Sequence, residues 1–300
     1  MMKAVTKNPK RNVSLYSIQL FSIRNFSLEL VITHTVSKMR FFFHINKIAW
    51  LLFMRIHKVH QLHKERLARS SKPFNARGAN VNRCEFCQVH KDHCICEYQP
   101  ETTSDAAFLL IMFDTEVLKP SNTGKLIADV IPETHAYLWS RTEPSEEMLA
   151  LLNNEAYQPF VVFPEEQIED KSLVRNEVIM EEGKTPLFIL LDGSWREAGR
   201  MYRKSPYLHQ LPVLSFKSEQ LSNYIMRKAS KDHQLATAEV ASLVLDLFGE
   251  QQNARHLEHW FELFREHYLY SKRPVKGAER GMGLKRLIEF RTNLKVNNEI

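Results

Sequence analysis

Short apolar runs and amphipathic stretches alternate along the middle and C-terminal parts of the chain. Five apolar runs have the length of a strand, namely residues 107–113, 136–139, 160–163, 187–191 and 212–216. Helical periods lie between and after them, at residues 124–130, 146–152, 196–203, 238–248 and 257–269. Continuous apolar strands that alternate with helices are typical of parallel sheets, so the pattern predicts an α/β domain with a largely parallel sheet.

The residues that follow these apolar runs are polar and rich in turn formers. They are Asp114-Thr115-Glu116 with residues 120–124, then residues 140–144, Pro164 and residues 192–195. Ligands of open parallel sheets bind outside the carboxyl ends of the strands, so we expect these loops to converge on one crevice. Each loop also has a purely structural interpretation, since Ser, Asn and Asp often cap helices and Trp often lies in a core. Their shared placement at strand ends favours a site.

Several protein classes are excluded by missing motifs. The sequence has no G-x-G-x-x-G, G-x-x-x-x-G-K-[ST] or G-x-S-x-G pattern, so it lacks a Rossmann fingerprint, a P-loop and a serine nucleophile elbow. Its longest apolar stretch, residues 41–54, contains His44 and Lys47 and is shorter than the roughly 20 residues of a membrane helix. The N-terminus has no secretory signal, and we expect a cytoplasmic protein without a membrane partner.

Charge is distributed unevenly along the chain. Residues 1–53 and residues 54–83 each carry eight Lys or Arg and one acidic residue, whereas residues 84–300 carry 25 basic and 33 acidic residues. A basic arm on an acidic body is typical of a protein that binds a polyanion at one edge, although a solvated tail has the same composition. Residues 1–53 show no clean period, and we expect them to be dispensable, an extension upstream of a start at Met54.

All four cysteines fall within thirteen residues, as Cys84, Cys87, Cys94 and Cys96 in a C-x2-C-x6-C-x-C pattern. Four thiolates complete a tetrahedral zinc site, and a chain without an export signal keeps its thiols reduced. An iron–sulfur cluster uses the same ligand set and stays an alternative. His90 and His93 lie between the two pairs, and we interpret them as loop residues because four cysteines leave no vacancy.

Taken together, these motifs resemble the DTW-domain family, and more closely the bacterial tRNA-uridine aminocarboxypropyltransferases. The resemblance rests on the cysteine pattern, residues 112–124, 139–144, 191–195 and 237–240, and it runs from about Met54 to about Tyr270. Two departures are visible. The D-x-T-W signature is Asp192-Gly193-Ser194-Trp195 here, which keeps a hydroxyl at the third position, and the residue before Thr237 is Ala236, where the family often has Ser or Cys.

The resemblance implies transfer of the 3-amino-3-carboxypropyl group from S-adenosylmethionine to N3 of a uridine in the variable loop of tRNA, with release of methylthioadenosine. It also implies a fold related to the SPOUT methyltransferases, in which the chain is knotted. The implied organisation is an extension at residues 1–53, a basic arm at 54–83, a metal-binding segment at 84–100, a catalytic domain at 101–270 and a basic tail at 271–300. We expect that tail to be disordered or weakly helical.

The expected site residues follow from these motifs. Asp192 and Trp195 are the expected catalytic residues, Asp192 as a base toward N3 or as a ligand of the cofactor ammonium, and Trp195 as a stacking surface for a base. The expected cofactor-binding residues are Ser121, Asn122, Thr123, Gly124, Arg141, Pro164, Ser194, Thr237 and Glu239. The expected tRNA-binding residues are Arg55, Lys58, Lys64, Arg66, Arg69, Lys72, Arg77 and Arg83.

Two other functions stay open at this point. A SPOUT-like RNA methyltransferase would use the same cofactor and a similar crevice. A non-catalytic zinc-containing protein would bind tRNA without any dependence on S-adenosylmethionine. The sequence leaves the oligomeric state open and implies no obligate protein partner.

Overall fold

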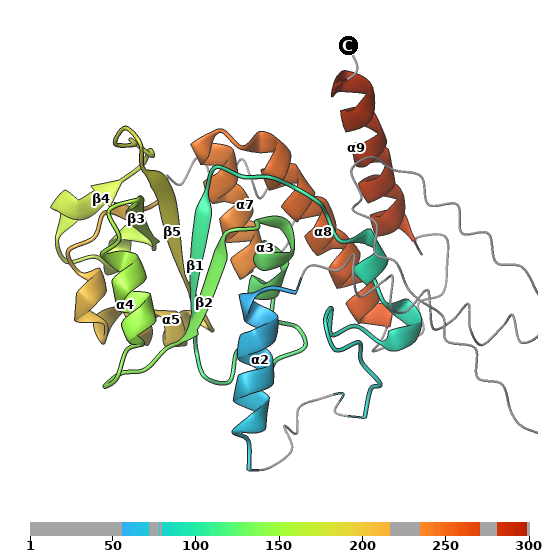
Figure 1. The fold of residues 1–300 in the computed structure, drawn as a ribbon, viewed down its shortest axis with the longest axis horizontal. Helices are drawn as coiled ribbons and strands as arrows, with labels where there is room; N and C mark the ends of the chain where they lie inside the picture. The colour runs from blue at the N-terminus through green and yellow to red at the C-terminus, as the bar shows by residue number, and fades with distance from the viewer. Residues whose placement is uncertain (1–55, 72–77, 79, 217–234, 271–280, 299–300) are drawn as a thin grey trace, which may run out of the picture. The chain divides into compact units, whose positions relative to one another are not determined.

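The computed structural model describes residues 56–71, 78, 80–216, 235–270 and 281–298. A single parallel sheet forms the centre of this part of the chain (Figure 1). Its strands are β1 Ala107–Met112, β2 Thr134–Leu138, β3 Tyr157–Val162, β4 Val174–Arg175, β5 Thr185–Asp192 and β6 Val213–Leu214. The strand order is β2-β1-β5-β3-β6-β4, and every neighbouring pair is parallel.

The two central strands are the most apolar. All six residues of β1 are buried, and β5 is buried along nearly its whole length. Side chains alternate between the two faces of a strand, so a strand with helices on both sides needs apolar residues at every position. Met112 pairs with both Leu138 and Asp192, which brings the carboxyl ends of β1, β2 and β5 level with one another.

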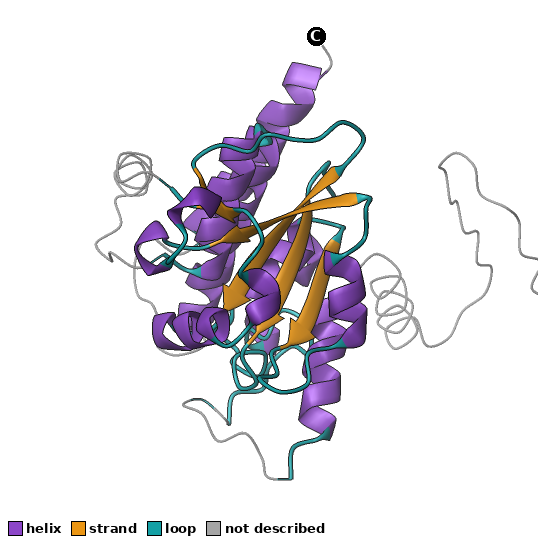
Figure 2. Cartoon of the chain, turned by 90° about the vertical axis from the view of Figure 1, so that its left-hand side faces the viewer, coloured by secondary structure: helices purple, strands orange, loops and turns teal. Residues whose placement is uncertain are grey.

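Helices cover both faces of the sheet (Figure 2). One face packs against α2 Lys58–Ala68, α3 Gly124–Val130, α7 Thr237–Phe248 and α8 Gln251–Tyr270. The other face packs against α4 Glu146–Leu152 and α5 Trp195–Arg203. Phe108 and Leu110 of β1 point to the first face and Leu109 and Ile111 to the second. The prediction of an α/β domain with a parallel sheet is confirmed.

Two elements were missed by the sequence pattern. β4 has only two residues, too few for any periodicity to appear. The C-terminal stretch was expected to be disordered or weakly helical; residues 282–298 form the helix α9 Met282–Asn298, so the disordered alternative was wrong for these residues. Leu287 is fully buried and Phe290 packs on His256 and His259, which fixes α9 on α8.

Two further expectations concern residues or features that the structure does not decide. A knot in the chain stays a prediction, because residues 217–234, which join β6 to α7, lie outside the described residues. Residues 1–53 lie outside them as well. None of the helices in the described ranges is both long enough and apolar enough to cross a bilayer.

Candidate functional site

Asp192 is the last residue of β5 and lies at the carboxyl edge of the sheet. Its side chain is buried, with 2% of the residue exposed. Asn122 Nδ2 donates a hydrogen bond to Asp192 Oδ2 at 2.6 Å, and the Thr237 hydroxyl donates one to Oδ1 at 2.6 Å. The carboxylate therefore joins the loop before α3 to the start of α7, two segments that are more than 100 residues apart in the chain.

Gly124 allows this close approach. A Cβ at position 124 would lie 2.7 Å from Asp192 Oδ2 and 3.4 Å from Asn122 Oδ1, closer to the carboxylate than real Cβ atoms come. Only glycine therefore lets α3 begin directly against the carboxylate. Glycine is used here because it has no side chain and so permits close approach of a neighbouring group.

Burial raises the pKa of the Asp192 carboxyl from 3.8 to about 6, although the hydrogen bonds from Thr237 and Asn122 act in the opposite direction. Loss of hydration disfavours the charged form, and the two donors stabilise it only in part. A carboxyl with this pKa is largely ionised at neutral pH and can accept a proton more readily than an exposed aspartate.

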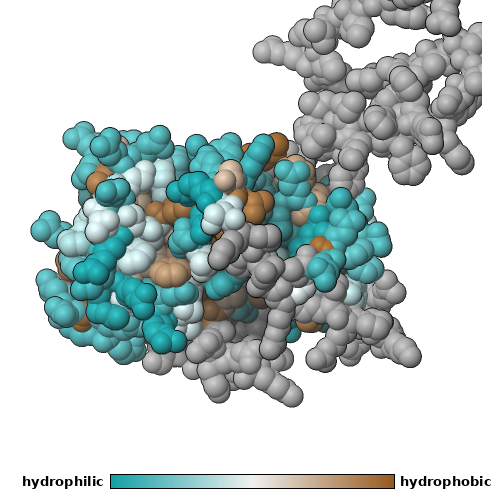
Figure 3. Space-filling view, turned by 90° about the horizontal axis from the view of Figure 1, so that it is seen from below, coloured by the Kyte–Doolittle hydropathy of each residue, from teal (hydrophilic) through white to brown (hydrophobic). Residues whose placement is uncertain are grey.

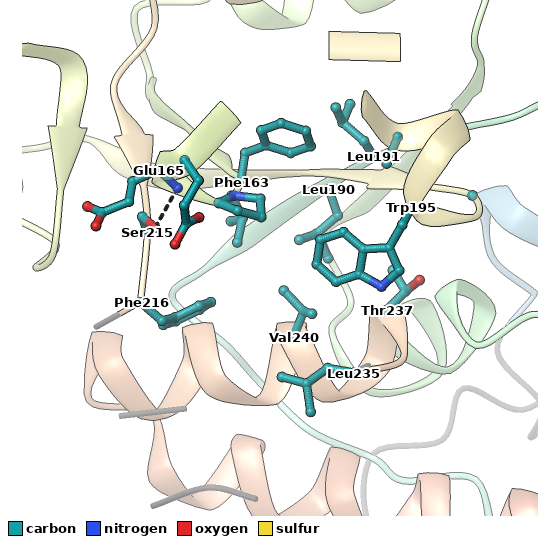
Figure 4. A pocket seen from close by; sticks show the side chains of 15 residues that line it. Phe163, Glu165, Leu190, Leu191, Trp195, Ser215, Phe216, Leu235, Thr237 and Val240 are labelled. Carbon is teal, nitrogen blue, oxygen red and sulfur yellow. Dashed lines mark hydrogen bonds between the residues drawn. The ribbon is translucent and has the colours of Figure 1, made fainter. Parts of the chain in front are cut away.

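A pocket of about 230 Å³ lies beside this carboxylate. Its walls come from the ends of β3, β5 and β6 and from the starts of α5 and α7 (Figure 4). Trp195 and Thr237 lie at one end and Glu165 and Ser215 at the other, with Leu190 and Val240 between them. The lining is mainly apolar with a few polar groups, which is typical of a site for a small molecule with an aromatic part.

Besides Asp192, the sequence-predicted residues fall into four groups. Pro164, Thr237 and Trp195 line the pocket, and Trp195 is 45% exposed there. Asn122, Thr123 and Gly124 lie behind it, where Asn122 holds Asp192 and Thr123 Oγ1 accepts from the backbone of Ala238 at 3.4 Å. Ser121 and Arg141 are exposed and are not among the pocket-lining residues.

Ser194 and Glu239 have local bonds. The Ser194 side chain caps α5 and exchanges hydrogen bonds with Glu197. Glu239 Oε2 accepts from the backbone N–H of Ala236 at 2.8 Å and so caps α7. Each side chain fixes where its helix begins, and so positions the pocket residues Trp195 and Thr237 at the starts of α5 and α7.

Sequence reasoning missed most of the pocket wall. Glu165 and Glu166 follow Pro164 directly, and Ser215 and Phe216 follow β6. The Ser215 hydroxyl accepts from the backbone N–H of Glu165 at 3.0 Å and joins the two loops (Figure 4). The other loops were selected by inspecting the residues after each predicted strand. The same inspection, continued beyond Pro164, would also have found Glu165 and Glu166.

A buried polar network lies behind α3, and no sequence motif indicates it. Asp129 accepts hydrogen bonds from Trp260 Nε1 and Gln99 Nε2 at 3.0 Å each, and its Oδ1 lies 3.1 Å from His57 Nε2. Lys125 is buried, donates to the Pro120 carbonyl at 3.0 Å, and has its pKa lowered to about 8 by burial. The Lys125 bond holds the loop before α3, and the Asp129 contacts join α3 to α8 and to the segments around His57 and Gln99.

The four cysteine sulfurs form one compact cluster. They lie within 4.8 Å of one another, with Cys84 and Cys96 Sγ atoms 3.6 Å apart and Cys87 and Cys94 Sγ atoms 3.7 Å apart. A tetrahedral zinc ion with bonds of about 2.3 Å requires sulfur separations of about 3.8 Å. The four residues therefore fit zinc in number, chemistry and spacing.

A tight turn sets up the first cysteine pair. The Cys84 N–H donates to Val89 O at 2.7 Å, and Gln88, at φ +61°, donates its N–H to Cys84 O at 3.1 Å. His90 Nδ1 accepts from the backbone N–H of Asp92, and neither His90 nor His93 belongs to the sulfur cluster.

The expected tRNA-binding residues are differently placed. Lys58, Lys64 and Arg69 are exposed on or next to α2. Arg66 donates to both oxygens of Asp114 at 2.7 Å, which ties α2 to the loop after β1. Arg83 donates to Gln88 O and lies over the ring of Tyr268. Arg55, Lys72 and Arg77 lie outside the described residues.

The fold and site define a class of protein. It is an α/β protein with a largely apolar pocket at the carboxyl edge of a parallel sheet, a buried carboxylate beside that pocket and a cluster of four cysteines that fits a metal ion. The family model of the DTW domain matches residues 81–269, and the chain belongs to this family. The match includes the cysteine cluster, the whole sheet and nearly all of α8. No solved structure matches the chain.

Proposed function

We propose that this protein transfers the 3-amino-3-carboxypropyl group from S-adenosylmethionine to N3 of a uridine in tRNA. Membership of the DTW family, which is associated with tRNA-uridine aminocarboxypropyl transfer, supports the proposal. The observation that carries it is the buried Asp192 at the end of β5, one hydrogen bond away from a pocket with an exposed Trp195.

The pocket suits the adenosine part of the co-substrate. Leu190, Leu191 and Val240 give it apolar walls, and Glu165 at one end is an acceptor for hydroxyl groups. Trp195 offers an aromatic plane at the other end, where a purine or a splayed uracil can stack. S-adenosylmethionine supplies a carbon, Cγ, that is bonded to a sulfonium. The sulfur leaves as a neutral thioether. The main task of the protein is therefore to align that carbon with N3 and to remove a proton.

Asp192 is the base that accepts the proton lost from N3 of the uridine. In the reaction the bond between Cγ and sulfur breaks, its electron pair stays on sulfur, a bond between N3 and Cγ forms, and the N3 proton leaves. Asp192 itself is not part of the pocket wall, but Thr237 is, and the Thr237 hydroxyl donates to Asp192 Oδ1. The N3 proton can pass to Thr237 Oγ while the Thr237 proton passes to Asp192. Asp192 then returns its proton to solvent.

Asp192 could instead hold the ammonium group of S-adenosylmethionine. The two roles differ in a measurable way, because a base acts on the chemical step and an ammonium ligand acts on binding. If Asp192 is the base, Asp192→Asn abolishes product while the Kd of S-adenosylmethionine changes little. A large loss of cofactor affinity assigns it the ammonium role.

The four cysteines hold structural zinc in this proposal. Residues Cys84, Cys87, Cys94 and Cys96 fill all four positions of a tetrahedral site, so no position is left for a substrate. The exposed cations on or next to α2, namely Lys58, Lys64 and Arg69, contact the tRNA backbone.

The test uses S-adenosylmethionine labelled either in its methyl group or in its carboxyl group, incubated with the full chain and bulk tRNA. The proposal predicts that only the carboxyl label enters tRNA. Transfer of the methyl label alone assigns the protein to the RNA methyltransferases. Incorporation of neither label together with firm tRNA binding assigns it to the non-catalytic binders.

A further inference from the structure

Helix α5 carries a row of arginines on its outer side. Arg196, Arg200 and Arg203 are exposed, and their spacing of four and three residues places them within one narrow stripe of a helix. The opposite side of α5 is buried through Ala198, Met201 and Tyr202, which belong to the core on that face of the sheet. We call these three arginines the α5 arginine stripe.

The charges of the stripe are not neutralised within the described part of the molecule. No ion pair or hydrogen bond joins any of the three guanidinium groups to another residue in the described ranges. Glu197, the acidic residue in the first turn, accepts hydrogen bonds from Ser194; Arg200 lies near enough to help lower the pKa of its carboxyl but forms no close ion pair with it. Residues 84–300 carry more acidic than basic residues, so a run of three unpaired arginines stands out from its surroundings.

The helix backbone leaves room for the last arginine to lie flat. A Cβ at position 199 would be 3.1 Å from Arg203 Nη1 and 3.0 Å from Gln167 Oε1. The absence of a side chain at Gly199 thus lets the Arg203 guanidinium rest against the helix. A guanidinium held in this way loses less conformational entropy on binding an anion than a freely rotating side chain does.

The stripe begins at the pocket. Trp195 is the first residue of α5, and both Trp195 and Ala198 line the pocket, so Arg196 directly follows a pocket-lining residue in the helix. Figure 3 views the molecule from the side on which α5 lies in Figure 1, and hydrophilic residues cover much of that surface. From Arg196 to Arg203 the helix rises about 10 Å, which matches about three phosphate-to-phosphate steps along the axis of a stacked strand.

We propose that the α5 arginine stripe binds the phosphates next to the uridine that enters the pocket. Trp195 then contacts the extruded base, and Arg196, Arg200 and Arg203 hold the backbone on one side of it. Guanidinium groups bind phosphate oxygens in bidentate fashion, which suits a row that must fix register as well as supply charge. The inference rests on the proposed function in taking tRNA as the substrate, and it adds a surface that is separate from the cations of α2.

The test compares two double variants of the full chain. Arg200→Gln/Arg203→Gln removes two charges from the stripe. Lys184→Gln/Arg255→Gln removes two from exposed or half-exposed sites near the opposite edge of the sheet, since Lys184 precedes β5 and Arg255 lies in the first turns of α8. Binding of end-labelled bulk tRNA is measured by fluorescence anisotropy at several salt concentrations. Calorimetry with S-adenosylmethionine checks that the pocket is intact in both variants.

Each lost phosphate contact lowers the slope of log K against log salt by about 0.7 to 0.9. The stripe variant is therefore expected to lose about 1.4 to 1.8 in slope and about 15- to 30-fold in affinity at 0.15 M salt, whereas the control keeps the slope of the wild type. Equal slopes and affinities in the two variants overturn the inference. Failure of the proposed function is a separate result, because it is seen in the wild type as the absence of carboxyl label in tRNA whatever the stripe variant does.

Discussion

Asp192→Asn is expected to make the protein more stable while it abolishes product formation. The carboxyl has a pKa of 3.8 when unperturbed and about 6 in the fold, where it is fully buried. The folded state therefore holds its proton over a pH range in which the unfolded chain has released it, and stability falls as pH rises through this range. Each unit of pKa corresponds to about 1.4 kcal/mol, so ionised Asp192 destabilises the fold by about 3 kcal/mol above pH 7.

An amide at position 192 avoids this penalty and can keep both hydrogen bonds. Its oxygen can accept from Asn122 Nδ2, and its NH₂ group can donate to the Thr237 hydroxyl oxygen, which has free lone pairs. The amide does not titrate. The stability difference between Asp192→Asn and the wild type should therefore widen by about 1.4 kcal/mol between pH 5 and pH 8, which corresponds to about 3 to 5 °C in Tm.

Thermal unfolding of both proteins across this pH range measures the difference. Asp170→Asn is a suitable control, because Asp170 is exposed and its pKa is lowered by hydrogen bonds from Ser172, so its removal should not stabilise the protein at high pH. If the gap between Asp192→Asn and the wild type stays constant or narrows from pH 5 to pH 8, the carboxyl does not carry the raised pKa and the reasoning is refuted.

Three further predictions concern the same edge of the sheet and the metal segment. The kcat/KM for tRNA should rise with pH through a pKa near 6 and then level off, because Asp192 accepts a proton only when ionised; a flat profile from pH 5 to pH 8 would exclude it as the base. Gly124→Ala should lower Tm and product formation, since its Cβ would stand 2.7 Å from Asp192 Oδ2 and overpacking of this kind destabilises by about 1 to 3 kcal/mol; an unchanged Tm would show that the loop yields freely. Cys94→Ser should reduce bound zinc, measured by mass spectrometry of the metal, and lower Tm by an amount comparable to chelator treatment of the wild type; full zinc occupancy in the variant would contradict a four-cysteine site.

The central sheet could be predicted from sequence because its strands are buried on both faces. A segment such as Ala107–Met112 has no polar position to obscure it, and the helices Gly124–Val130 and Glu146–Leu152 were found with their bounds as observed. Helix α9 was not identified because its apolar residues do not gather on one face: Leu287 is buried, whereas Met282, Ile288 and Val296 are exposed.

The candidate site also has a part that could be predicted from the sequence and a part that could not. The rule that ligands bind at the carboxyl ends of strands identified Asp192 and Trp195, and the family resemblance identified Thr237; the three lie together in the structure. It could not show that Asp192 is set behind Thr237, since this depends on the packing of α7 against β5. Nor could it identify the network of Asp129, Lys125 and His57, because a buried polar residue has the same sequence signature as an exposed one until its partners are known.

Mass spectrometry of nucleosides tests the central claim most directly. Bulk tRNA is incubated with the full chain and S-adenosylmethionine, digested and analysed, with Asp192→Asn as the matched control. The account predicts a uridine that has gained an aminocarboxypropyl group, an equal amount of methylthioadenosine, and neither product with the variant. A methylated nucleoside, or tRNA left unmodified by a wild-type protein that binds both tRNA and S-adenosylmethionine, would contradict it.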